Sequence, residues 1–280
     1  MNFSFSKLVH YIKKLYVIYF ERLPYINWFN PLMTLYLNFR SFPLRQAWKL
    51  PVFVYGRPML FSLYGDMECK DMCKCGMVRL NQTNTGMPNN PGTDTAINNW
   101  GKIIFHGKCE IFTANKINVA RDAVLELGAG TKIMCMCNIT AHKSVHIGAH
   151  SRVVHRCQVM DSNFHFIADF VHNKIRRYTK PVYIGNYCWI CNSSTVAAGS
   201  IIPNKTIVAS NSLVNKDMSN IPEESMIGGI PAKHIATGFR RVESFKLESQ
   251  LFDFFYNNPE EDYYVISENA SHSICDCDDV

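Results

Sequence analysis

Apolar residues recur every six positions along the C-terminal half of the chain. The clearest run contains six aliphatic residues without interruption: Ile184, Ile190, Val196, Ile202, Val208 and Val214. Shorter runs with the same period come earlier: Ile111 and Ile117; Leu127, Ile133 and Ile139; Ile147, Val153 and Val159. Side chains on one face recur about every 3.6 residues in an α-helix and every 2 in a β-strand, so neither alone gives this period. The pattern predicts a solenoid in which six residues form one short strand and one turn.

The residues between these aliphatic positions are small or turn-forming, as sharp corners require. They include Gly185, Asn192, Gly199, Asn204 and Ser210. Three units would close one triangular coil, and successive coils would stack by parallel strand pairing. One coil cannot bury its own apolar face, so a stable core needs several coils.

The chain divides into four segments by composition. Residues 1–60 are aromatic and basic, 61–100 are expected to form an irregular connection, and 101–242 contain the repeat. Residues 243–280 hold an aromatic stretch and an acidic end, which predict a short C-terminal helix and tail. We therefore predict an all-β fold, a parallel β-helix, preceded by a partly helical, partly irregular extension.

Charge differs sharply between the two ends. Residues 1–60 contain eight Lys and Arg against one acidic residue, whereas residues 243–280 contain ten acidic residues against one Lys. Apolar residues within 1–23 have helical spacing and are flanked by Lys7, Lys13 and Lys14. This segment predicts an amphipathic helix that lies on a membrane surface or, alternatively, packs on the main domain or a neighbouring subunit.

Several classes of protein are not expected. No stretch is long and apolar enough for a spanning helix, and we expect no secretory signal peptide. The eleven cysteines are odd in number and scattered, which favours reduced thiols. We therefore expect a cytoplasmic protein, either free or bound at the inner face of the membrane. The spacing of the cysteines lacks a zinc pattern, so no metal is expected. Nor do the basic residues follow a nucleic-acid-binding motif.

Three segments carry a family resemblance: PVYIGNYCWI (181–190), VASNSLVNKD (208–217) and IGGIPAKHI (227–235). With the repeat, they resemble the hexapeptide-repeat acyltransferases, in particular the sugar O-acetyltransferases of bacterial capsule and lipopolysaccharide assembly. The resemblance covers about residues 101–242. It implies left-handed coils, a homotrimer with sites between neighbours, acetyl-CoA as co-substrate and a hydroxyl of a sugar or glycan precursor as acceptor.

Residues 161–181 interrupt the six-residue period and therefore predict a surface loop, where functional residues concentrate. The family places its catalytic histidine in such a loop, which corresponds to His165. Imidazole is suited to remove a hydroxyl proton at neutral pH. The family usually has proline after this histidine, whereas this chain has Phe166.

Further site residues are implied by the same resemblance. Asp161 would orient the imidazole or hold an acceptor hydroxyl, with a turn carboxylate that has no site role as the alternative. Trp189 would wall the acceptor pocket, with packing on the coil surface as the alternative. The residues expected to contact acetyl-CoA are Asn192, Ser210, Asn215, Lys216 and Lys233, the last near the nucleotide phosphates. Lysines beside phosphates are electrostatically favourable. Asn211 stands where the family often has glycine, and its side chain would narrow the cofactor groove.

Two other functions fit a β-helix. One is a non-catalytic scaffold, which would keep the repeat without the histidine and cofactor motifs. The other is a zinc enzyme of the γ-carbonic anhydrase type, which needs three protein ligands. His150 and His155 have the spacing of two such ligands, but Ala114 occupies the position expected for the third.

Overall fold

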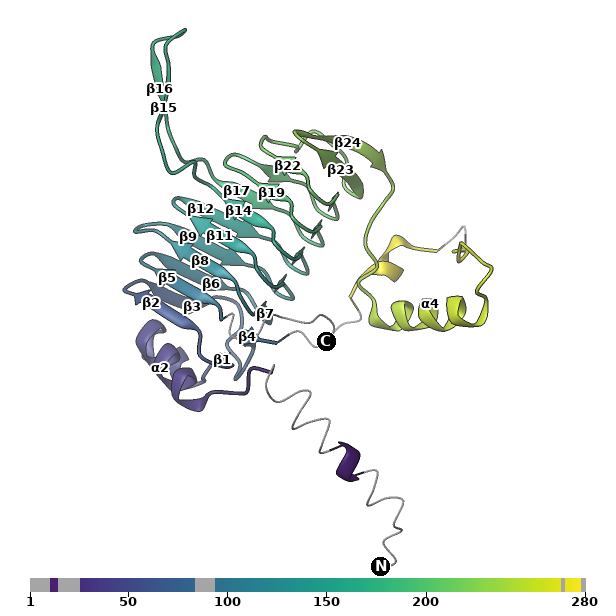
Figure 1. Cartoon of the computed structure of the whole chain (residues 1–280), viewed down its shortest axis with the longest axis horizontal. Coiled ribbons are helices and arrows are strands. Elements are labelled where there is room, and N and C mark those ends of the chain that lie inside the picture. The colour runs from purple at the N-terminus through teal and green to yellow at the C-terminus, as the bar shows by residue number, and fades with distance from the viewer. Residues whose placement is uncertain (1–10, 15–25, 84–93, 268–269, 278–280) are drawn as a thin grey trace, which may run out of the picture.

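The computed structural model describes residues 11–14, 26–83, 94–267 and 270–277. Strands wind about a common axis and stack into three sheets, which form the sides of a long coil (Figure 1). Every pairing between successive coils is parallel, as the apolar period predicts. The predicted parallel β-helix is confirmed, and the left-handed winding stays an expectation from the resemblance.

Within the described residues, each sheet takes about every third strand of the chain. The first sheet contains β1 (Val52–Val54), β4 (Val78–Gln82), β7 (Cys109–Phe112), β10 (Lys132–Ile133), β13 (Arg152–Val153), β18 (Trp189–Ile190), β21 (Ile207–Val208), β23 (Ser225–Gly229) and β24 (Ala232–Thr237). The second contains β2 (Met59–Leu63), β5 (Ala96–Asn99), β8 (Lys116–Val119), β11 (Asn138–Ala141), β14 (Gln158–Met160), β19 (Thr195–Val196) and β22 (Leu213–Val214). The third contains β3 (Asp66–Cys69), β6 (Lys102–Phe105), β9 (Val124–Leu127), β12 (Ser144–Ile147), β17 (Val182–Ile184) and β20 (Ile201–Ile202).

The register of these ladders explains the six-residue period. Ile133, Val153, Ile190 and Val208 are paired neighbours along the first sheet. All four side chains are fully buried. Equivalent positions of successive coils therefore form one continuous aliphatic column, which no single coil could bury.

The corners need residues that tolerate a left-handed backbone or a close approach. Arg156, Ser193 and Asn211 stand at equivalent corners with φ of 60°, 59° and 57°, a region that most non-glycine residues avoid. Gly185 is required for a different reason, since a Cβ there would lie 2.6 Å from the backbone nitrogen of Asn204 in the next coil. The predicted turn residues thus set how tightly the coils stack.

The coil begins earlier than the predicted boundary at residue 101. Strands β1 to β5 already belong to the three sheets, although 61–100 was expected to be an irregular connection. These strands are separated by connections of unequal length, so they show no six-residue period. Residues 84–93, part of the expected connection, lie outside the described residues.

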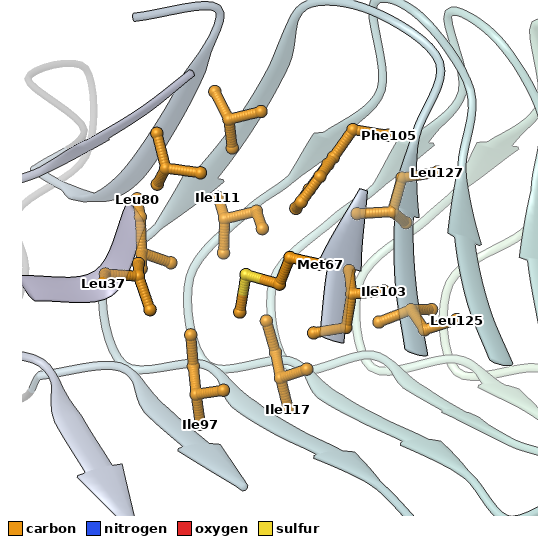
Figure 2. A pocket seen from close by; sticks show the side chains of 12 residues that line it. Leu37, Met67, Leu80, Ile97, Ile103, Phe105, Ile111, Ile117, Leu125 and Leu127 are labelled. Carbon is orange, nitrogen blue, oxygen red and sulfur yellow. The ribbon is translucent and has the colours of Figure 1, made fainter. Parts of the chain in front are cut away.

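Helix α2 (Pro31–Ser41) covers the N-terminal end of the coil (Figure 1). It begins after Asn30, whose side chain accepts a hydrogen bond from the Met33 backbone N–H at 3.0 Å. Its Leu37 points into the coil interior beside Leu80 (Figure 2) and is fully buried. The space left among these apolar side chains is about 10 Å³, too little for a ligand. Helix α3 (Leu44–Ala47) follows.

At the opposite end of the coil, the first sheet finishes with β24, which pairs antiparallel with β23. The chain then leaves the coil, forms α4 (Phe245–Asn257) and ends its described part with the 3-10 helix η3 (His272–Cys275). The predicted C-terminal helix is therefore present. The predicted helix over residues 1–23 lies mostly outside the described residues, which include only 11–14 of it. No helix within the described residues is long and apolar enough to cross a membrane.

Candidate functional site

Residues 161–181 leave the coil between β14 and β17 and project from it (Figure 1). Their outer part is an antiparallel hairpin of β15 (Ile167–Asp169) and β16 (Lys174–Arg176). At its base, the Asn163 N–H donates to the Tyr178 carbonyl at 2.9 Å, and the Lys180 N–H donates to the Asp161 carbonyl at 2.9 Å. We call this segment the insertion. The predicted interruption of the repeat is confirmed.

His165 lies on the outgoing side of the insertion and is exposed. Its neighbours are held by aromatic contacts: the Phe164 ring lies 5.1 Å from that of His142, and the Phe166 ring lies 4.9 Å from that of Tyr178. No residue in the described part of the chain hydrogen-bonds to the His165 imidazole. The ring therefore has both nitrogens accessible for proton transfer with a substrate.

The Asp161 side chain makes the contacts of a turn carboxylate, which was the alternative to a role in the site. Its side chain is fully buried. One carboxylate oxygen accepts the His142 backbone N–H at 2.7 Å, and the other accepts those of Lys143 and Ser144 at 2.6 and 2.7 Å. Because the carboxylate is buried and bound in this way, it neither touches the His165 ring nor faces an acceptor. It instead ties the start of the insertion to the preceding coil.

Trp189 lies on the first sheet, whereas the insertion leaves the corner between the second and third sheets. Within one chain, His165 and Trp189 are therefore on different sides of the coil. The Arg241 guanidinium lies 5.6 Å from the centre of the half-buried Trp189 ring. Arg152, the partner of Trp189 in the adjacent strand, makes a 2.8 Å ion pair with Glu243. The segment leading to α4 thus runs along this face.

Asn192 and Ser210 occupy equivalent positions of two successive coils, at the corner between the first and second sheets. Both residues are exposed, and the Asn211 backbone N–H donates to the Asn192 carbonyl at 2.9 Å. Asn211 adopts the left-handed conformation for which glycine would be favourable. The structure thus brings these two predicted cofactor residues into one column.

Lys216 and Lys233 line one cavity of about 430 Å³ near the C-terminal end of the coil. Lys216 follows β22, and Lys233 belongs to β24. Asp217 and His234 lie in the same wall. The exposed Asn215 adjoins Lys216, at the other end of β22 from Ser210. The two predicted lysines are therefore together, while Asn192 and Ser210 stand at another corner.

His155 precedes Asn192 and Ser210 in the same corner column, one coil earlier. Its Nε2 is buried and has no hydrogen-bond partner within the described residues. Burial, and then the charge of the adjacent Arg156, lowers the pKa of His155 and favours the neutral ring. The sequence drew attention to His155 only as one of two candidate zinc ligands. Its place in the column follows from the register between coils, and this register cannot be predicted without knowing the length of the insertion.

The zinc alternative is not supported by these positions. The His150 ring stacks on Tyr187 with 4.7 Å between centres, at a corner different from that of His155. Among the described residues, no group of three or more His, Cys, Asp or Glu side chains could hold a metal ion.

The third sheet carries a cluster of histidines and carboxylates that the sequence did not predict. The His106 imidazole contacts Asp71 through Nδ1 and lies 2.5 Å from Glu126 through Nε2. The other Glu126 oxygen lies 3.4 Å from His146, whose ring stacks on Tyr183. Burial opposes protonation of His106, but the two carboxylates outweigh it and raise its pKa. These residues come from separate coils, so no local motif announces them.

Comparisons with known proteins found partial sequence similarity to one acetyltransferase and several similar solved structures. No family model matches. The chain is 40% identical over 57 residues to WbbJ of Escherichia coli (strain K12), which is named as an O-acetyl transferase of lipopolysaccharide biosynthesis. This match spans 20% of the chain and 28% of WbbJ.

Solved structures are similar at lower sequence identity. The polySia-specific acetyltransferase NeuO is 17% identical, with 75% of this chain and 95% of that one covered and a TM-score of 0.43. The polysialic acid O-acetyltransferase OatWY is 19% identical, with 70% and 95% covered and a TM-score of 0.37. The hexapeptide-repeat acetyltransferase VCA0836 from Vibrio cholerae O1 biovar eltor, solved with acetyl-CoA, is 21% identical, with 48% and 70% covered and a TM-score of 0.40. The predicted resemblance to an O-acetyltransferase of lipopolysaccharide assembly is thus confirmed for the 57 residues that match WbbJ.

Proposed function

We propose that this protein transfers an acetyl group from acetyl-CoA to a hydroxyl of a sugar or glycan precursor. The observation that carries the proposal is the 40% identity over 57 residues to a protein named as an O-acetyl transferase of lipopolysaccharide biosynthesis. The parallel coils and the histidine-bearing insertion support it, since they match what the family resemblance implies. No metal takes part in this proposal.

His165 acts as the general base. Its neutral imidazole removes the acceptor's hydroxyl proton while that oxygen attacks the thioester carbonyl. A backbone N–H of the coil stabilises the oxyanion that forms. The intermediate then expels the CoA thiolate, which takes the proton from the imidazolium, and the acetyl ester of the acceptor remains. The accessible ring supports this role.

Acetyl-CoA is held along the coil. The cavity lined by Lys216 and Lys233 suits its phosphates, because two ammonium groups face one space of about 430 Å³. Asn192, Ser210 and Asn215 contact the pantetheine arm from the neighbouring coil corners. Since these residues do not share one corner, the arm would cross a side of the coil or use residues of two subunits.

The active unit is a homotrimer with sites shared between subunits. Within one chain, His165 and Trp189 are on different sides, so a site that uses both needs two chains. The insertion also exposes apolar side chains that a second copy would cover: Phe164, Phe166, Ile167, Phe170, Val171 and Ile175, each at least 50% exposed. Membrane contact through residues 1–23, in the cytoplasm, remains part of this proposal.

Turnover is the direct test of the function. The full chain is incubated with acetyl-CoA and a panel of neutral and acidic glycans, and free thiol and acetylated product are measured. We expect thiol release that depends on one acceptor class, with an ester of matching mass. If no acceptor class produces thiol release, the result would favour the non-catalytic scaffold.

Mixing two inactive variants tests the shared site. His165→Ala and Trp189→Ala chains are co-expressed at equal levels and purified together. If each site takes one residue from each of two neighbours, random assembly restores about a quarter of wild-type turnover. Separately purified variants mixed after assembly are the control and should remain inactive. No recovery in co-expressed protein would place both residues in one chain's site, whereas a Trp189→Ala chain that is active by itself would remove Trp189 from the site.

A further inference from the structure

The N-terminal end of the coil exposes an unusual number of large apolar side chains. Seven of them, on α2, on the turns around α3 and on β2, have exposed fractions between 44% and 78%: Leu32, Leu35, Tyr36, Leu44, Trp48, Phe61 and Tyr64. We call these residues the cap surface. Isolated exposed apolar residues are normal, but a group of this size marks an interaction site.

Contacts connect α2 with the aromatic side chains on both sides of it. The Trp48 ring meets that of Phe39 of α2 edge-on, with 4.9 Å between centres. Arg40 of α2 lies 6.0 Å from the Tyr64 ring, and Tyr64 lies 4.6 Å from Trp100 of the next coil. The surface therefore extends from α3 across α2 to the side of the coil.

A rigid base supports the cap surface. Thr34 and Asn38, on the inner face of α2, accept the backbone N–H groups of Val54 and Val52 at 3.0 and 3.1 Å. Leu37 fills the end of the coil interior. Because α2 is held by buried contacts, its outer face cannot turn inward to hide its apolar side chains.

The charged residues within 26–65 are all positive, and Asp66, the first acidic residue after them, is exposed at the edge of the cap surface. Arg40, Arg45, Lys49 and Arg57 are exposed, and the sequence from 26 to 65 contains no acidic residue. Residues 1–23 have the same aromatic and basic composition, with Lys7, Lys13 and Lys14. Apart from Glu21, every charged residue in the first 65 positions is therefore basic.

We propose that the cap surface binds the anionic surface of a lipid membrane. Tryptophan and tyrosine favour the level of the lipid headgroups, and arginine and lysine pair with lipid phosphates. A membrane fits better than an acidic protein segment, because the cationic and aromatic character continues along the sequence into residues 1–23. This surface is separate from the insertion and from the lysine-lined cavity, so the inference does not depend on the proposed reaction.

Vesicle flotation of the full chain tests the inference. The probes are vesicles of phosphatidylcholine alone and of phosphatidylcholine mixed with phosphatidylglycerol. We expect binding to the anionic vesicles, weaker binding at higher salt, and little binding to the neutral ones. The triple variant R45E/K49E/R57E should lower the partition coefficient about a hundredfold or more. Trp48→Ala should lower the partition coefficient less, and the size of this decrease should be the same at low and high salt.

Two matched triple variants locate the binding site. K108E/K116E/R121E reverses three exposed charges on later coils and should bind as the wild type does. K7E/K13E/K14E reverses three charges of the first segment and should lower binding less than R45E/K49E/R57E does. Circular dichroism and thermal melting of every variant check that it folds.

Three outcomes would overturn the inference. The first is a wild-type chain that does not bind anionic vesicles, and the second is R45E/K49E/R57E binding them unchanged. The third is loss of binding only in K7E/K13E/K14E, which would move membrane contact to residues 1–23. If instead the wild type forms polymers that the cap variant abolishes, without vesicle binding, the cap surface docks on the acidic C-terminal part of another copy.

Discussion

The coils formed by residues 182–214 and the insertion that precedes them are neighbours with opposite construction. In the coils, aliphatic side chains such as Ile190 and Val208 are fully buried. In the insertion, apolar side chains such as Phe170 and Val171 are more than 80% exposed. The coils are stabilised by their own interior, whereas the insertion is held at its base and leaves its outer part for a partner.

This difference separates stability from activity along the chain. Buried positions of the coils tolerate little change in volume, since protein interiors are closely packed. The insertion can present a histidine because its side chains are not committed to a core. We therefore expect substitutions in the two regions to affect different measurements.

The largest effect is expected for His165→Ala in the insertion. Turnover should fall about a hundredfold to ten-thousandfold, because the general base is lost. Acetyl-CoA binding by calorimetry and the melting temperature should stay at wild-type values, since the side chain is exposed. Unchanged turnover with a proven acceptor would remove His165 from the mechanism.

Ile190→Ala in the coils should show the reverse pattern. Removing a fully buried isoleucine leaves a cavity and should lower the free energy of unfolding by about 2–5 kcal/mol. Chemical denaturation measures it. The control in the insertion is Lys174→Ala, because this side chain is exposed and is not among those expected at the subunit contact, so the change should stay within about 0.5 kcal/mol. Equal losses at both positions would contradict the comparison.

Asp161→Asn tests the joint between the two regions. The amide nitrogen cannot accept the N–H groups that the carboxylate accepts now, so unfolding should become easier by about 1–3 kcal/mol. Turnover should fall as well, because the start of the insertion loses its anchor. A variant with full stability and reduced turnover would instead indicate direct contact between Asp161 and substrate.

The smallest effect concerns pH and a cluster outside both regions. The pKa of His106 is raised above 6.5, because Asp71 and Glu126 outweigh the burial that opposes its protonation. The protonated ring therefore adds stability that is complete below pH 6.5 and is lost as pH rises through the folded pKa. Melting temperatures between pH 6 and 8.5 should fall more in the wild type than in His106→Gln. Parallel curves of melting temperature against pH would show that the charge on His106 does not contribute to stability.

The sequence predicted the regular coils well because their strands, interior side chains and corners share one period. It placed the start of the coil too late, since connections of unequal length between β1 and β5 hide the same architecture. The insertion could be predicted as a break, and His165 within it by resemblance. No local pattern indicates that Asp161 is buried, because its three partners come from the preceding coil.

Contacts between coils were the least predictable part of the site. Lys216 and Lys233 share a cavity although β23 separates them along the chain, and this needs the antiparallel return of β24. His155 joins the column of Asn192 and Ser210 only when the length of the insertion is known. Such alignments follow from register, which a single sequence does not reveal where the period slips.

The closure of both ends of the first sheet has a consequence for growth of the fold. The Val52 and Val54 N–H groups of β1 are bound by side chains of α2, and the other end of the first sheet finishes with the antiparallel strand β24. In the first sheet, neither end therefore offers a free strand on which a further parallel rung could add. A lengthened homologue would have to gain its extra turns internally, and each added turn would move the cap surface one step further from the lysine-lined cavity.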